Sequence, residues 1–308
     1  MLQACSRGER RQEQPSELKS APPLESRSMM IAIRPWMRVR TLSIIPVFFG
    51  LAAYAAQQEA DRAVTLVYQF PEGKSISCRQ TSTESQFMQI GGQDMNVLNQ
   101  GTLEFTAKLK AMKESNIGLG VTIDTMKISV QSPQGDLSPD LSQIIGKSFD
   151  MTLSRLGKEL DTSAAAAIKY QVDPNSSRDL STAFQAFFPD LPDRPVKKGD
   201  TWPSEDKVIQ NSGSGQIIIN AKNANTVDGF ETVEGIECAR IKTAVTGTLA
   251  GNLEQGGVGL TLDCKLEGSG TWYFAVKEGF LVKSDSRSKF SGTIVAGEPA
   301  NLTIPLTG

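Results

Sequence analysis

The stretch LEFTAKLKA, residues 103–111, alternates apolar and polar side chains over its whole length. Its apolar residues share one phase: Leu103, Phe105, Ala107, Leu109 and Ala111. Successive side chains of a β-strand point to opposite faces, so the pattern predicts a strand with one buried face. The stretch VGLTLDCKL, residues 258–266, repeats the alternation in the C-terminal half. Alternation of this kind therefore decides the fold class.

Turn signals separate the alternating segments. The predicted turns are Gly91-Gly92, Ser115-Asn116, Asp228-Gly229, Gly256-Gly257 and Glu278-Gly279. The apolar phase changes between Ile123 and Met126, which predicts a β-bulge near Asp124. We therefore expect a mainly β fold, a curved and half-barrel-like antiparallel sheet with a few short helices.

A weak internal repeat divides the chain after the leader. The string FPEGKSI at 70–76 resembles VKKGDTW at 196–202, and each precedes an alternating segment. This predicts two related β-halves, residues 62–160 and 196–308, joined by a helical connector at 161–195. Chance similarity between two β-meanders is the alternative.

The connector carries an apolar stripe with helical spacing, formed by Leu180, Ala183, Phe184, Phe187 and Phe188. The stripe predicts a helix over 176–188 that is capped at Ser176, ends at Pro189 and covers the sheet. Because a sheet and a helix can enclose an apolar hollow, the candidate ligand-lining residues are Phe184, Phe187, Phe188 and Trp202. Ordinary core packing is the alternative for all four.

The N-terminal region resembles a secretory signal peptide at residues 37–55. Arg38 and Arg40 precede an apolar run, and Ala53 and Ala55 form a small-residue step. Residues 1–36 are polar and lack apolar periodicity, so we expect a disordered or mis-annotated leader. The protein is thus expected to be exported, periplasmic or extracellular, with an uncleaved single-span membrane anchor as the alternative.

Composition restricts the chemistry. The chain has 32 Lys and Arg against 34 Asp and Glu, which argues against a nucleic-acid partner. It has no histidine, so no His-based catalytic triad can form and the commonest zinc ligand is missing. We expect no enzyme activity, no catalytic residue, no metal and no cofactor. The acidic residues Asp193, Asp200, Glu205 and Asp206 are interpreted as a solvated turn surface.

Three cysteines follow the leader: Cys78, Cys238 and Cys264. In an oxidising compartment a disulfide between Cys238 and Cys264 is one hypothesis, since both lie in predicted strands of the same half. The other is that all three are buried thiols.

One string is distinctive, FPDLPDRPVKKGDTW at residues 188–202, with Tyr68, Phe70 and Gly73 before it and Trp272 and Phe274 after it. It resembles an uncharacterised family of exported bacterial proteins with an FPxLPxxPVxxGDxW-like centre, and this resemblance implies no activity. A more distant architectural resemblance is to periplasmic lipoprotein-carrier-like folds, in which a curved sheet shelters an apolar cavity.

Two functional hypotheses follow. The first is an exported cell-envelope protein that binds or carries an apolar or amphiphilic ligand, such as a lipid. The second is a non-catalytic structural or protein-interaction module of the envelope. An enzyme would instead require a cleft that holds two or more carboxylates with strongly shifted pKa values.

Overall fold

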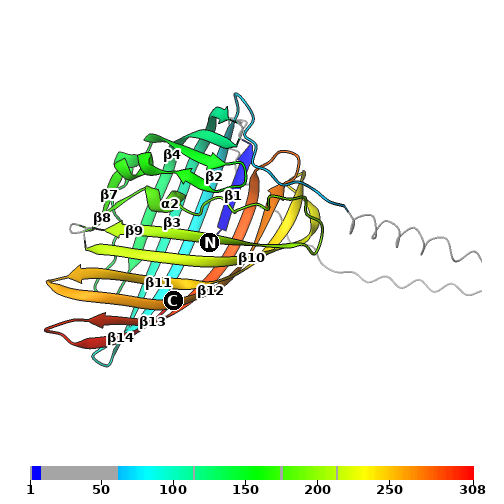
Figure 1. Ribbon diagram of the computed structural model, residues 1–308. Coiled ribbons are helices and arrows are strands. Elements are labelled where there is room, and N and C mark those ends of the chain that lie inside the picture. Colours follow the sequence, from blue (N-terminus) through cyan, green and yellow to red (C-terminus); the bar gives the residue numbers. More distant parts are fainter. Residues whose placement is uncertain (1, 8–61, 114, 174–175, 213) are drawn as a thin grey trace, which may run out of the picture. The chain divides into compact units, whose positions relative to one another are not determined.

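Two β-meanders form one open antiparallel sheet in the computed structural model (Figure 1). The first meander comprises β2 (Ser75–Ile90), β3 (Gln93–Lys113), β4 (Asn116–Gln131), β5 (Ser148–Ser154) and β6 (Glu159–Asp161). The second comprises β9 (Thr201–Ser212), β10 (Gly215–Val233), β11 (Ile236–Gln255), β12 (Val258–Ala275) and β13 (Leu281–Ala296). The mainly β, antiparallel fold is therefore confirmed.

The structure describes residues 2–7, 62–113, 115–173, 176–212 and 214–308, which belong to one unit. The predicted signal peptide at 37–55 and all but the first few residues of the predicted leader lie outside these ranges. Among the described residues, no helix combines the length and apolar character that a membrane span requires.

The sheet order is β6-β5-β4-β3-β2-β1-β13-β12-β11-β10-β9, so the two meanders follow one another in the same sense across the sheet. The short strands β1 (Leu2–Arg7) and β14 (Leu302–Thr307) each pair with both β2 and β13. In the predicted repeat, Gly73 and Gly199 both have positive φ (67° and 89°), and each lies just before the first strand of its meander.

Side chains that point to the face of Phe105 and Trp272 form what we call the inner face of the sheet. Glycines on this face allow neighbouring strands to approach closely. A Cβ atom on Gly247 would lie 2.1 Å from the backbone oxygen of Asn220, and one on Gly292 would lie 2.0 Å from that of Asp263. Figure 1 shows the strand direction turning strongly from the first meander to the second, as expected for a twisted sheet.

The predicted bulge is confirmed, because the register of β3 with β4 shifts at Asp124, between the pairs Glu104–Thr125 and Phe105–Ile123. The predicted turn at Asp228-Gly229 is wrong. These residues lie inside β10, where the register shifts between Val227 and Gly229, and the chain reverses at Glu234-Gly235 instead. A glycine inside an alternating strand therefore marked a bulge and not a turn.

The connector differs most from its prediction. It contains the 3₁₀ turn η2 (Ser163–Ala167), the hairpin of β7 (Lys169–Asp173) and β8 (Ser176–Asp179), and the single helical turn α2 (Ser181–Phe184). The other 3₁₀ turn, η1 (Ser142–Ile144), precedes it, between β4 and β5. The predicted helix over 176–188 is wrong, because 176–179 pair with β7 and Ala186 has a φ of 59°. Tertiary packing of Phe184, Phe187 and Phe188 thus outweighs the helical spacing of these residues.

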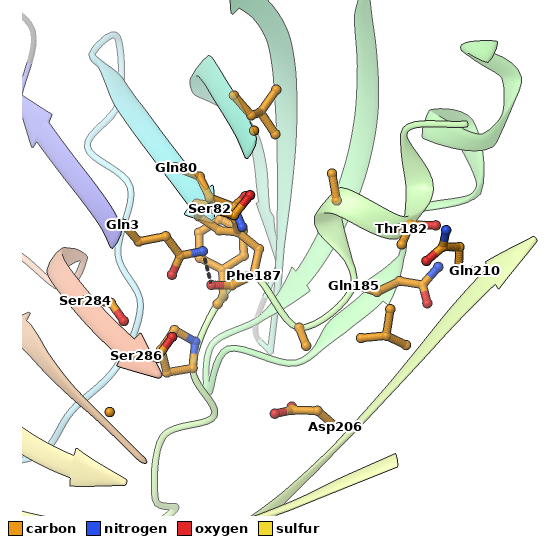
Figure 2. Close-up of a pocket in the computed structure, with 18 of the residues that line it drawn as sticks. Gln3, Gln80, Ser82, Thr182, Gln185, Phe187, Asp206, Gln210, Ser284 and Ser286 are labelled. Carbon is orange, nitrogen blue, oxygen red and sulfur yellow. Dashed lines mark hydrogen bonds between the residues drawn. The ribbon is translucent and has the colours of Figure 1, made fainter. Parts of the chain in front are cut away.

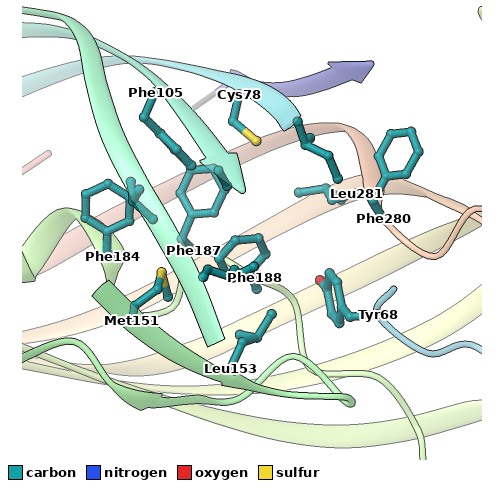
Figure 3. Packing of buried hydrophobic residues seen from close by; sticks show 14 of the residues in the cluster. Tyr68, Cys78, Phe105, Met151, Leu153, Phe184, Phe187, Phe188, Phe280 and Leu281 are labelled. Carbon is teal, nitrogen blue, oxygen red and sulfur yellow. The ribbon is translucent and has the colours of Figure 1, made fainter. Parts of the chain in front are cut away.

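The main core lies between one end of the inner face and the connector. Phe184 packs edge-on against Phe105 and Phe149, with ring centroids 5.0 and 4.9 Å apart. Phe187 packs against Phe105, also at 5.0 Å (Figure 3). The segment before β2 completes this core, because Tyr68 lies 5.6 Å from Phe188 and 5.1 Å from Phe274.

Two predictions about the N-terminus and the cysteines need correction. Leu2–Arg7 is a strand and not disordered, because its backbone pairs with both β2 and β13. The Cys238–Cys264 disulfide is wrong, since both thiols are free and buried. Cys238 pairs with Ala275 and Cys264 with Leu249, so the two cysteines lie about 36 Å apart along β11 and β12. Cys78 is disulfide-bonded, and Cys5 is its register partner in β1.

Candidate functional site

A pocket of about 590 Å³ lies next to the core, between the inner face and residues 182–190 of the connector. The inner-face lining comes from both meanders, and Gln3 contributes from β1 between them. Figure 2 shows Gln3, Gln80 and Ser82 on one side of the pocket and Asp206 and Gln210 on the other. The volume lies within the range of about 300–1,000 Å³ that is typical of small-molecule sites.

The lining from the first meander is mixed, with polar Gln80, Ser82 and Glu84 on β2 and an apolar group on β3 and β4. Leu103 on β3 and Met126 and Ile128 on β4 all line the pocket. Leu103 is buried, whereas Met126 and Ile128 are half-buried. A second hollow of about 740 Å³ adjoins this side and shares Met126 and Ile128 with the pocket.

The lining from the second meander includes a hydrogen-bonded set of side chains, which we call the polar row. Its members are Ser204, Asp206, Asn223, Asn225, Thr243 and Trp272. They lie on adjacent strands because the register places Asn223 opposite Ser204, Asn225 opposite Thr243, and Thr243 beside Trp272 on β12. The row is therefore fixed by pairing of strands, and not by a flexible loop.

Short contacts hold the polar row together. Trp272 Nε1 lies 2.9 Å from Thr243 Oγ1, and Thr243 Oγ1 lies 2.6 Å from Asn225 Oδ1. Asn225 Nδ2 lies 3.1 Å from Ser204 Oγ. Asn223 Nδ2 lies 3.3 Å from Ser204 Oγ and 2.6 Å from Asp206 Oδ2.

The connector wall of the pocket is fixed by side chains that bind its backbone. Glu159 accepts a hydrogen bond from Phe188 N at 2.8 Å, and Tyr68 donates to the carbonyl of Pro189 at 3.1 Å. Trp202 Nε1 donates to the carbonyl of Asp190 at 3.0 Å. These bonds place residues 187–190 against the core and leave one side of the segment facing the pocket.

Gln185 attaches the same wall to edge strand β9. Its Oε1 accepts from Ile209 N at 2.7 Å, and its Nε2 donates to the carbonyl of Ile209 at 3.4 Å. A single side-chain amide thus supplies the donor and acceptor that a neighbouring strand would offer. This closes part of an edge that could otherwise pair with another chain.

Three carboxyl groups near this wall have raised pKa values. Burial raises the pKa of Glu159 to about 7, and the charges of Asp190 and Asp206 act in the same direction. Burial also raises the pKa of Asp190, as does the charge of Asp206. The pKa of Asp206 is raised by burial, while its bond from Asn223 and the charge of Lys158 oppose the shift.

The structure separates the four predicted ligand-lining residues into two groups. Phe187 and Phe188 line the pocket, although only 2% and 4% of each residue is exposed. Phe184 and Trp202 do not line it. Phe184 is fully enclosed in the core, and Trp202 packs edge-on against Trp272 with ring centroids 6.1 Å apart. For these two residues, core packing is the correct interpretation.

The polar row was not predicted from the sequence, although polar residues at inward-facing positions of β10 indicate it. Along β10, the inner-face positions continue from buried Val227 to Asn225 and Asn223. Polar residues at the inward phase of a strand indicate a site or a buried network. Asp206 was assigned to a solvated turn surface, but it lies on β9 and faces the pocket.

Within the described ranges, no group of three or more Cys, Asp or Glu residues is arranged to hold a metal ion. Comparisons with protein-family models, with curated proteins and with solved structures gave no match. The resemblances of the central string and of the architecture therefore stay predictions, and the pocket is the feature of the molecule that bears on function.

Proposed function

We propose that this protein binds an amphiphilic small molecule in the pocket and acts outside the cytoplasm as a non-catalytic binding or carrier protein of the cell envelope. One observation carries the proposal, namely that an apolar group on β3 and β4 and the hydrogen-bonded polar row line the same pocket. Leu103, Met126 and Ile128 offer an apolar surface on β3 and β4, whereas the polar row occupies β9 to β12.

An apolar group and a fixed polar row in one pocket suit a molecule with one polar and one apolar part. An apolar chain on the β3–β4 side removes half-buried Met126 and Ile128 from water, which favours binding by about 25 cal/mol per Å² of apolar surface covered. A polar group at the polar row finds fixed hydrogen-bonding partners.

The carboxyl groups favour acid–base catalysis on a bound ligand as a second candidate. Asp190 and Asp206 line the pocket, and both have raised pKa values. The most strongly shifted group, Glu159, is not among the lining residues, and its carboxylate holds Phe188 N. We therefore favour binding without catalysis. Hydrolysis of the ligand during incubation with the protein would instead support the second candidate.

The experiment that tests the binding function is mass spectrometry of the purified full-length protein. Organic extraction of protein isolated without detergent should release an amphiphile in near-stoichiometric amount. Native mass spectrometry should then show uptake of an added amphiphile by the extracted protein. An empty extract together with absence of uptake would contradict the proposal.

A further inference from the structure

Trp272 fixes the direction of the hydrogen bonds at one end of the polar row. An indole N–H only donates, so Thr243 Oγ1 accepts from Trp272 and directs its own hydrogen to Asn225 Oδ1. The other end of the Asn225 amide is therefore its nitrogen, and this donates to Ser204 Oγ.

The hydrogen bonds at the opposite end of the row also make Ser204 Oγ an acceptor. An ionised carboxylate only accepts, so Asn223 Nδ2 donates to Asp206 Oδ2 and also to Ser204 Oγ. Ser204 Oγ thus accepts two hydrogen bonds, and its own hydrogen has no acceptor within the described residues. Among the same residues, the second oxygen of Asp206 and the Oδ1 of Asn223 have no donor. The row therefore presents one donor beside two acceptors.

We propose that the polar part of the ligand is an uncharged polyhydroxyl group, such as a sugar or a glycerol unit. This inference rests on the amphiphile-binding function proposed above. A hydroxyl both accepts and donates, so it satisfies Ser204 on one side and Asp206 or Asn223 on the other. An ammonium group offers no acceptor to Ser204. A sulfate or phosphate diester offers no donor to Asp206, and its charge repels that carboxylate.

The extent of the row favours several hydroxyls over one. Ser204, Asn223 and Thr243 lie on three adjacent strands, β9, β10 and β11, which span about 10 Å. A single hydroxyl contacts only part of that length. A ring or chain with several hydroxyls contacts more of it, and Gln80 and Ser82 line the facing side of the pocket.

The test uses the full-length protein and three amphiphiles with the same dodecyl chain, each below its micelle concentration. Their head groups are maltoside, trimethylammonium and sulfate. Isothermal titration calorimetry should give the tightest binding for dodecyl maltoside, by about tenfold or more over the two charged compounds. A separate titration with free maltose measures whether the sugar alone is sufficient.

Variants locate the preference in the polar row. Ser204→Ala removes the unpaired donor, and Thr243→Val disconnects Asn225 from Trp272. Each should weaken dodecyl maltoside binding about five- to tenfold and change binding of the charged compounds little. Thr246→Val is the matched control, since Thr246 lies on the same strand with its side chain exposed on the other face. Circular dichroism of each variant verifies that the sheet is retained.

Each outcome discriminates between the two proposals. Preference for maltoside that Ser204→Ala abolishes supports the inference. Equal binding of all three head groups, or tightest binding of the trimethylammonium or sulfate compound, overturns it and leaves amphiphile binding intact. Absence of binding for all three compounds overturns amphiphile binding and the inference with it.

Discussion

The carboxylate of Glu159 accepts a hydrogen bond from the backbone N–H of Phe188 at 2.8 Å, and this contact joins strand β6 to the connector wall of the pocket. The bond connects a titrating group to the segment that shapes the pocket. Burial raises the pKa of Glu159 from its ordinary value of 4.5 to about 7. The stability of the fold should therefore depend on pH.

The sign follows from proton binding. Between about pH 4.5 and 7 the folded state holds a proton on Glu159 that the unfolded state has released, so stability falls as pH rises through this window. The loss is at most about 3 kcal/mol and is complete above the folded pKa. Glu159→Gln keeps an acceptor for Phe188 N but does not titrate, so its urea midpoint should change less between pH 5 and 8. Equal pH dependence of the urea midpoint in Glu159→Gln and wild type would contradict this assignment. The control is Glu205→Gln at an exposed residue, which should keep the pH dependence of the wild type.

Core packing of Phe184 yields a second prediction. Its ring is fully enclosed and contacts Phe105 and Phe149 edge-on, so Phe184→Ala should lower the free energy of unfolding by about 3–5 kcal/mol. The control Phe87→Ala, at a residue that is 45% exposed, should cost much less. Chemical denaturation of the two variants measures the difference, and similar stability losses would place Phe184 outside the core.

The Gln185 contact predicts a local change in backbone protection. Gln185→Ala removes the acceptor of Ile209 N, so hydrogen exchange at Ile209 should accelerate while exchange at the centre of β11 stays unchanged. Gln185→Glu retains an oxygen acceptor and should keep most of the protection. Unchanged exchange at Ile209 in Gln185→Ala would show that other contacts protect this edge.

Cys78, Cys238 and Cys264 should differ in reactivity. Cys238 and Cys264 are free and buried, and burial raises the pKa of Cys238 to about 11, so neither should be alkylated in the native protein. Both should react after denaturation without reductant. Cys78 should react only after reduction, because it is disulfide-bonded. Peptide mapping measures all three sites, and alkylation of Cys78 without reductant would contradict the pairing.

Local alternation was sufficient to predict the sheet, because strand periodicity depends on which side chains meet water. It even located the bulge at Asp124, where the apolar phase changes. The helix at 176–188 was wrong because Phe184, Phe187 and Phe188 meet the core from an irregular backbone, and spacing alone does not distinguish the two. Local patterns also do not show which distant segments pair. For this reason the prediction treated residues 2–7 as disordered and joined Cys238 to Cys264, and both were wrong.

The candidate site was only partly predictable for a related reason. Of the four candidates proposed from the sequence, Phe187 and Phe188 lie at the pocket, whereas Phe184 and Trp202 do not. The polar row requires that Ser204, Asn223 and Thr243 be neighbours, and this depends on the register of three strands. A sequence gives the face on which each residue lies, but register across strands comes only from the folded sheet.

The most direct test of the central claim is calorimetric titration of dodecyl maltoside into two variants that differ by one position on β11. Val245 lines the pocket, so Val245→Trp should fill it and weaken binding at least about tenfold relative to wild type. Ala244 is exposed on the opposite face, so Ala244→Trp should bind as wild type does. Equal binding by Val245→Trp and Ala244→Trp, or no binding by wild-type protein, would contradict the account.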